Sequence, residues 1–186
     1  MKNLIIGILT SFISISIVQS QNHHNHSDEP NQTSNNVDLG NVNDIIKGQI
    51  NQVLTIYYEV KTALVGSNGK TAKIKAGALV QLLSKVETGK MTEEQKVFFT
   101  QYAEKIKFDA EHINETEDAG HQRDHLNDLS NNIWAITKAF KANSNPVYQQ
   151  YCPMKKTYWM SNEQGIKNPY YGNQMLTCGK ITETLK

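Results

Sequence analysis

The sequence predicts a mainly α protein: an antiparallel four-helix bundle with an irregular, aromatic-rich C-terminal extension. Apolar residues recur at intervals of three and four through residues 42–143, as in helices that bury one face. Short polar segments separate these stretches, and short connections favour antiparallel neighbours. After residues 143–146 (Asn-Ser-Asn-Pro) the helical spacing ends and Tyr and Trp become frequent. Residues 144–186 are therefore expected to pack on the bundle of residues 42–143, within one domain.

The first two predicted helices are bounded by capping residues and glycines. The first begins near Val42, with Asn43 or Asp44 as its N-cap, and ends at the Gly-Ser-Asn-Gly break of residues 66–69. The second covers residues 71–86 and ends before Gly89, which favours a C-terminal cap. The residues expected to be buried by the two helices are Ile46, Ile50, Val53, Leu54, Tyr57, Val60 and Leu64, then Ala72, Ala76, Leu79, Leu83 and Val86.

The third and fourth predicted helices carry the clearest signals. The third begins at a capping box over residues 92–95, in which Thr92 and Gln95 reciprocally satisfy free backbone N–H groups. Its apolar stripe is expected to comprise Val97, Phe98, Tyr102, Ile106 and Ile113. The fourth is predicted from apolar residues spaced three, four, three and four apart: Leu126, Leu129, Ile133, Ile136 and Phe140.

Residues 1–20 are predicted to be a signal peptide. Lys2 supplies a positive charge, and an almost uninterrupted apolar run follows over residues 4–18. The run is short for a membrane span, which needs roughly 20 residues, and Ser20 is a small residue at a cleavage position. We expect export to the periplasm, or secretion, and a mature form that does not span the membrane. Residues 21–41, rich in Asn, Ser, His and Gln, are expected to form a flexible tail.

Charge and motifs exclude several classes of function. The chain has 19 basic and 18 acidic residues, and this formal charge of +1 gives no cationic field for nucleic acid. The sequence lacks the His-Glu-x-x-His motif of zinc enzymes, a glycine-rich phosphate loop and a Gly-x-Ser-x-Gly elbow. We therefore expect a protein that is not an enzyme and has no organic cofactor.

Two pairs of sulfur-containing residues lie in the C-terminal extension. Cys152 and Met154 are two positions apart, and Met175 and Cys178 repeat the pairing in reversed order, three positions apart. Thiolate and thioether sulfur are polarisable ligands, which select copper(I) over magnesium, calcium or manganese. These four residues would suffice for one copper(I) site.

A disulfide between Cys152 and Cys178 is the alternative to metal binding. Two cysteines in an exported protein commonly pair. Such a bond would stabilise the extension by about 3–4 kcal/mol through loop closure, with the methionines filling gaps in the packing. A thiol–disulfide oxidoreductase is disfavoured, because reactive pairs usually have Cys-x-x-Cys spacing.

Histidines are the second kind of candidate ligand. His121 and His125 lie one turn apart on one face of the predicted fourth helix, where they could share a metal ion. The alternative is that both are partly exposed helix residues with acidic neighbours. His23, His24 and His26 form a short tract that either captures a divalent metal loosely or belongs to a solvated tail.

Several motifs, taken in order, resemble those of a known family. The family is a bacterial periplasmic helical domain of unknown function, found alone or fused to the periplasmic adaptor subunits of copper and heavy-metal efflux systems. The resemblance covers about residues 46–181, and Leu126 departs from it by replacing the usual Phe. The motifs are Tyr-x-x-x-Lys-x-Ala-Leu in the first helix, Gln-Arg-x-His at residues 122–125, Tyr-Cys-Pro-Met at 151–154 and Asn-Pro-Tyr-Tyr-Gly-x-x-Met-x-x-Cys-Gly at 168–179.

The resemblance implies a role in metal handling. It implies that Cys152, Met154, His125, Met175 and Cys178 lie where the family has its sulfur and imidazole groups. We therefore expect a periplasmic copper(I)-binding protein of heavy-metal resistance, which sequesters the ion or delivers it to an efflux or assembly partner. The alternative is a structural or docking module without metal, stabilised by a disulfide between the two cysteines.

Overall fold

The structure is a computed structural model that describes residues 37–186, and it is mainly helical, as predicted. The predicted signal peptide, most of the predicted tail and its three histidines lie outside the described residues. None of the described helices is long and apolar enough to cross a membrane. The elements are α1 (Asp44–Val65), α2 (Gly69–Leu83), η1 (Thr88–Lys90), α3 (Glu93–Glu115), α4 (Ala119–Ala139), β1 (Val147–Cys152), β2 (Thr157–Ser161), η2 (Gly172–Gln174) and β3 (Lys180–Leu185).

The helix ends are fixed by the caps that the sequence contains. The Asn43 side chain accepts a hydrogen bond from the Ile45 N–H, so α1 begins where it was predicted to begin. The predicted capping box is confirmed, because Thr92 Oγ1 accepts from Gln95 N at 3.2 Å and Gln95 Oε1 accepts from Thr92 N at 3.1 Å. The second helix differs from its prediction: it begins at Gly69 and ends at Leu83, and Gly89 lies in η1.

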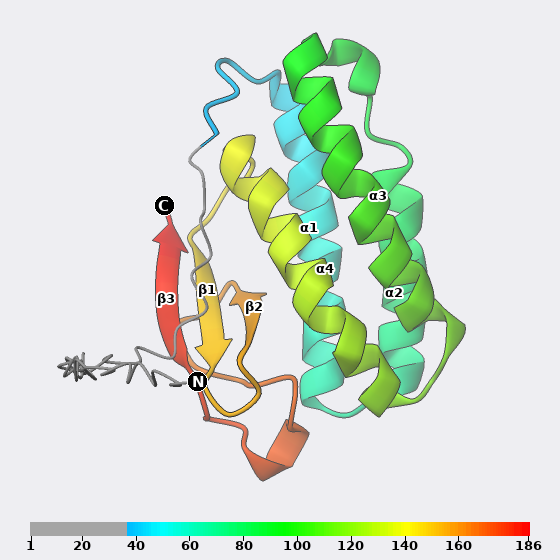
Figure 1. The fold of residues 1–186 in the computed structure, drawn as a ribbon, viewed down its shortest axis with the longest axis vertical. Helices are drawn as coiled ribbons and strands as arrows, with labels where there is room; N and C mark the ends of the chain where they lie inside the picture. The colour runs from blue at the N-terminus through cyan, green and yellow to red at the C-terminus, as the bar shows by residue number, and fades with distance from the viewer. Residues whose placement is uncertain (1–36) are drawn as a thin grey trace, which may run out of the picture.

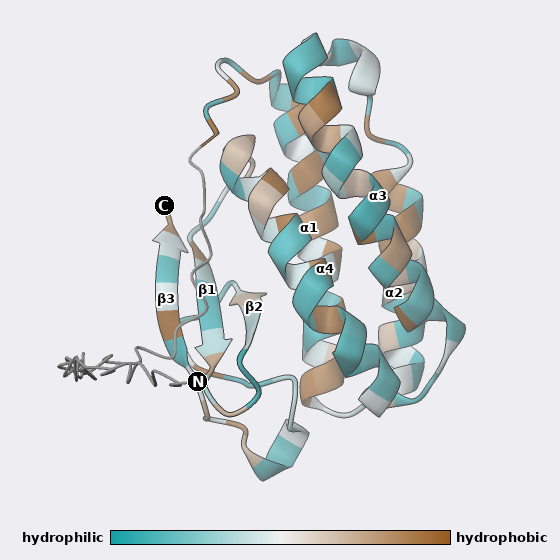
Figure 2. Ribbon diagram, in the orientation of Figure 1, coloured by the Kyte–Doolittle hydropathy of each residue, from teal (hydrophilic) through white to brown (hydrophobic). Residues whose placement is uncertain are grey.

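The four helices pack side by side around a shared apolar core (Figure 1). Successive helices contact one another, and α4 also returns to contact α1. Figure 2 shows apolar segments on the facing sides of the helices and polar segments on their outer sides. Every apolar residue predicted for the first and fourth helices is buried. Residues 37–41, the end of the predicted tail, also contact this core through buried Leu39, whose carbonyl accepts a hydrogen bond from Gln95 Nε2 at 2.9 Å.

The predicted apolar stripe of the third helix was partly wrong. Val97 is 66% exposed, whereas Phe99, which was not predicted, is buried. Phe99 lies seven positions before Ile106, so both residues face the core, and Val97 lies more than half a turn away from that face. Phe98 is half-buried at the rim, where its ring lies 6.2 Å from that of Phe140.

The C-terminal extension contains a small sheet of three strands, so the prediction of an irregular segment was wrong for these strands, although the segment between β2 and β3 contains no strand. Its strands are antiparallel in the order β2-β1-β3, with Gln150 of β1 opposite Trp159 of β2 and opposite Ile181 of β3. In Figure 1 the sheet lies beside α4, and β2 is the strand that contacts this helix. The polar residues Gln149 and Gln150 are buried in the central strand, which hides the alternation expected of a half-buried strand.

The outer edge of β2 is hydrogen-bonded to side chains of the helices. Asn127 Oδ1 accepts from the Tyr158 N–H at 2.9 Å, and the Tyr57 hydroxyl accepts from the Met160 N–H at 3.0 Å. Ser130 donates its own proton to the Leu126 carbonyl, so Tyr57 donates to Ser130 Oγ, at 2.7 Å. An edge strand leaves backbone donors unpaired. Here α1 and α4 provide the acceptors.

Arg123 of α4 joins the loop that follows β2 to the helices. Its Nε donates to the Pro169 carbonyl at 2.7 Å, and its Nη2 donates to the Leu64 carbonyl at 2.9 Å and to Ser67 Oγ at 2.7 Å. Gly172 allows this close approach, because its φ is +54° and a Cβ there would lie 2.7 Å from Ser67 Oγ.

Replacing Tyr57 with Phe tests whether the hydroxyl joins the sheet to the helices. The change leaves the buried Met160 N–H without an acceptor, so we expect the free energy of unfolding to fall by about 1–3 kcal/mol. Urea denaturation followed by circular dichroism measures it. Tyr102→Phe is the matched control, expected to change stability by less than about 0.5 kcal/mol. Equal stability of the two variants would show that this hydrogen bond does not hold the sheet.

Candidate functional site

Cys152 lies at the end of β1, where the chain turns back into β2. It is fully buried, opposite Thr157 in the strand pair. Its carbonyl accepts a hydrogen bond from the Lys156 N–H at 2.8 Å, and Lys156 adopts a positive φ of 57° that closes the turn. The tight turn thus fixes the backbone on which this thiol is carried.

Cys178 lies in the loop that enters β3, and it is half-buried. Its carbonyl accepts from Asn168 Nδ2 at 2.7 Å, and its N–H donates to the Met175 carbonyl at 3.1 Å. Because Tyr151 is paired with Lys180 across the two antiparallel strands, the loop before β3 lies next to the end of β1. The register of the sheet therefore brings the two cysteines together.

The two thiols are free and adjacent. Burial raises the pKa of Cys178, and Cys152 raises it further through its charge and a side-chain hydrogen bond between the two cysteines. A hydrogen bond from the Met154 backbone acts in the opposite direction on this pKa. The raised pKa means that Cys178 is protonated at neutral pH and would release its proton on binding a metal ion.

Both predicted thioether ligands are in segments that contact Cys178. The Met154 side chain is 64% exposed and that of Met175 is 39% exposed, so each can change its rotamer without disturbing the core. The structure therefore brings the backbones of all four predicted sulfur residues to one junction of turn and loop, where Cys152 is buried, Cys178 is half-buried and both methionines are exposed.

The predicted histidine ligands lie in a separate cluster between α3 and α4. The ring of His125 is stacked on that of His112, with centroids 4.6 Å apart, and lies 5.1 Å from that of His121. Nδ1 of His125 is 3.2 Å from Asp109 Oδ1. Nδ1 of His112 donates to the Phe108 carbonyl at 2.9 Å. The Nδ1 atoms of His112 and His125 are therefore both hydrogen-bonded.

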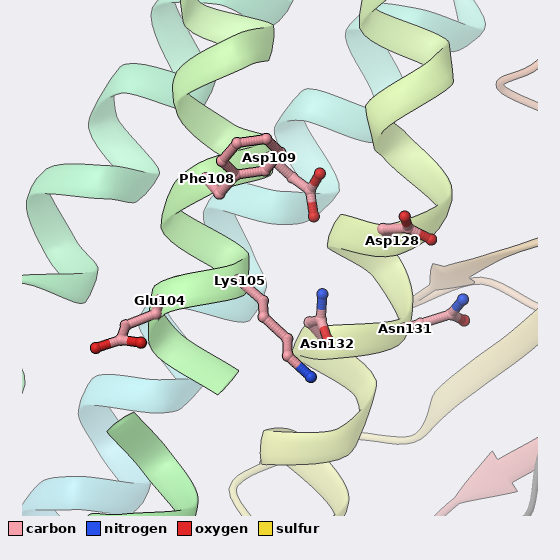
Figure 3. Close-up of a pocket in the computed structure, with 7 residues that line it drawn as sticks. All are labelled: Glu104, Lys105, Phe108, Asp109, Asp128, Asn131 and Asn132. Atoms are coloured by element: carbon pink, nitrogen blue, oxygen red, sulfur yellow. The ribbon is translucent and has the colours of Figure 1, made fainter. Parts of the chain in front are cut away.

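Asp109 lies at the wall of a pocket of about 510 Å³ between the same two helices. Figure 3 shows its carboxylate directed toward α4 and Asp128, whereas the Glu104 side chain points away. Asp109 is only 5% exposed, and burial raises its pKa. The hydrogen bond from His125 opposes this shift, and the negative charge of Asp128 adds to it.

The family to which the chain belongs is identified by its helical region. A profile described as a protein of unknown function, DUF3347, matches residues 53–145. The chain belongs to the DUF3347 family. No curated protein and no solved structure matches it. The match covers most of α1 and all of α2, α3 and α4, and it ends before β1, so the four candidate sulfur ligands of this DUF3347 protein lie outside it.

The structure brings the predicted ligands of this DUF3347 protein together as two groups. His121 and His125 share a helix face as predicted, but their ring contacts are with each other and with α3. Within residues 37–186, no three His, Cys, Asp or Glu side chains are gathered so that they could hold one metal ion. His112 was not predicted to join them. The turn of residues 116–118 places the last turn of α3 against the first turn of α4, and the sequence pattern did not locate this turn.

The raised pKa of Asp109 predicts a pH dependence of stability. The folded state binds the proton of this carboxyl more tightly than the unfolded chain does, so the free energy of unfolding should fall as pH rises above 3.8, the ordinary value. Asp109→Asn cannot titrate and should lack this component. Urea denaturation at successive pH values measures it, with Glu104→Gln as the matched control. Parallel pH profiles for Asp109→Asn and the unmodified protein would contradict the assignment.

Proposed function

We propose that this protein binds copper(I) through the thiolates of Cys152 and Cys178, in the periplasm, and either sequesters the ion or delivers it to a partner. The observation that carries the proposal is the adjacency of the two thiols, which share a side-chain hydrogen bond at the junction of turn and loop. Two thiolates are soft, anionic ligands, and copper(I) is the soft, singly charged ion that they favour.

The thioethers of Met154 and Met175 would complete the coordination. Both are exposed and lie in segments that contact Cys178, so they can approach an ion held by the two thiolates. Thioethers at the surface also suit transfer, because a partner could displace them before the thiolates. This ordering supports delivery as well as storage.

His121 and His125 were also predicted as ligands, but they lie outside the copper(I) site of this proposal. Donation from His125 Nδ1 to Asp109 leaves Nε2 free, and a carboxylate partner of this kind orients an imidazole for metal binding. Their contacts are nevertheless with α3 rather than with the sulfur residues. We therefore assign them no part in the copper(I) site.

The proposal includes the location and the partner. The predicted signal peptide would place the protein in the periplasm, where a component of a copper or heavy-metal efflux system would be the recipient. In this proposal the four helices form an antiparallel bundle that acts as a rigid scaffold, and the C-terminal sheet carries the metal. Exposed apolar side chains beside the thiols, those of Leu176 and Ile181, support a contact with another protein at this end.

A docking module without metal is the alternative function. The same adjacency of Cys152 and Cys178 would allow a disulfide, which would fasten the loop before β3 to the end of β1. The exposed apolar residues of this region would then form the docking surface: Met154, Met175, Leu176 and Ile181.

Titration with copper(I) against a competing chelator tests the leading proposal. Residues 21–186, which include every described element, would be reduced and titrated beside a Cys152→Ser, Cys178→Ser double variant. We expect the affinity to fall on the order of 100-fold or more, because both primary ligands are lost. His121→Ala, His125→Ala is the matched control and should retain the affinity.

Thiol counting separates the two functions. Accessible, titratable thiols after mild reduction, together with tight copper(I) binding, would support metal handling. Two results together would contradict copper(I) binding and favour the docking module. The cysteines would stay oxidised in the folded protein whatever the reductant, and the unmodified protein and the double variant would both bind copper(I) weakly.

A further inference from the structure

A second pocket lies between α1, the start of α2 and the segment that follows β2. Its volume is about 670 Å³. Its wall includes Tyr58 and Lys61 from α1, Asn68 and Thr71 from the N-cap and first turn of α2, and Glu163 and Lys167 from the segment after β2. None of these residues belongs to the sulfur junction or to the histidine cluster.

Lys61 is the unpaired cation of this pocket. Its side chain is only 3% exposed, and no residue within 37–186 forms a hydrogen bond or an ion pair with it. The other two lysines of the wall are paired: Lys75 with Glu59, and Lys167 with Glu163 at 2.6 Å. Burial lowers the pKa of Lys61, and the charge of Glu163 opposes this effect. A lysine that is largely buried and has no bonded anion can gain one from a ligand in the pocket.

The Tyr58 hydroxyl is a second donor without a partner. Its oxygen is buried, and no acceptor for it is found in the described part of the chain. Tyr58 and Lys61 are three positions apart on α1, so they lie on the same side of the helix. Both residues line the pocket, so a carboxylate bound there would find two donors on the same wall.

The start of α2 adds to the positive potential of the pocket. Asn68 caps this helix of 15 residues, and its first turn contains no acidic residue. A helix N-terminus is equivalent to a partial positive charge and favours anions. The wall as a whole carries three lysines and two glutamates, which is a net charge of +1.

We propose that this pocket binds a small organic monocarboxylate, whose carboxylate accepts hydrogen bonds from Lys61 and Tyr58. The net charge of the wall matches a ligand with one negative charge. A doubly charged phosphate would favour arginine, and none of the residues of the wall is an arginine. Ala63 and Val65 give an apolar surface for the carbon skeleton of the ligand. The proposal is independent of copper binding, because it uses no residue of either candidate metal group.

Calorimetry and amide NMR shifts test this site with butyrate, benzoate and inorganic phosphate as the probes. We expect both carboxylates to bind residues 21–186 and to shift amides of α1 and the start of α2. Lys61→Met, which keeps the aliphatic stem, should weaken carboxylate binding about 10-fold or more, and Tyr58→Phe should weaken it by a smaller factor. Lys96→Met, an exposed lysine on α3, is the matched control and should leave the affinity unchanged.

Circular dichroism of Lys61→Met must first show a folded protein, and Tyr58→Phe provides a second variant that retains the charge. Three results would overturn the proposal: no carboxylate binding at millimolar concentration, equal affinity in Lys61→Met and Lys96→Met, or tighter binding of phosphate than of either carboxylate. Loss of copper(I) binding in the cysteine variant, with carboxylate binding retained, would leave it intact.

Discussion

The sheet depends on acceptors that the helices supply to the outer edge of β2. Tyr57 and Asn127 accept hydrogen bonds from alternate residues of this strand, Met160 and Tyr158, so α1 and α4 occupy the edge that would otherwise be open. Burial raises the pKa of Tyr57 to about 12, and the hydroxyl therefore remains a donor to Ser130 at every physiological pH. These hydrogen bonds from β2 to Tyr57 and Asn127 fix where the sheet lies on the helices.

The position of the thiols follows from that edge. Once β2 is held, its pairing with β1 places Cys152, and the pairing of β1 with β3 places Cys178 beside it. Asn168 adds a hydrogen bond to the Cys178 carbonyl, and the buried Tyr170 hydroxyl donates to the carbonyl of Tyr158. The proposed copper(I) ligands are thus positioned by a network that begins in the helices, although none of them belongs to a helix. Family membership concerns residues 53–145, so the metal proposal rests on the chemistry of the C-terminal sheet.

Helical periodicity and capping chemistry predicted the helices well, because both are local. The Thr92 capping box and the stripe that ends at Phe140 needed no knowledge of distant residues. The strands were missed because buried Gln149 and Gln150 remove the alternation of apolar and polar residues that reveals a strand. Their burial is tolerated through partners distant in the sequence: Gln150 Nε2, for example, donates to the Glu163 carbonyl at 3.1 Å.

Two groups of candidate ligands were predicted from sequence, and the structure separates them. The spacing of His121 and His125 could predict a shared face, but not that α3 would add His112 and Asp109. The adjacency of Cys152 and Cys178 depends on strand register, which a sequence reading without strands could not provide. In the sequence, Lys61 stood out only as the lysine of the first-helix motif Tyr-x-x-x-Lys-x-Ala-Leu. Its burial beside a pocket is a property of the packed chain.

X-ray absorption at the copper edge of the copper(I)-loaded protein tests the central claim most directly, since it identifies the atoms bound to the ion. The account predicts a first coordination shell of sulfur alone, from Cys152 and Cys178 with thioether sulfur of Met154 or Met175. Scattering typical of imidazole, or a shell of nitrogen and oxygen, would contradict it and would move the site to the histidine cluster between α3 and α4.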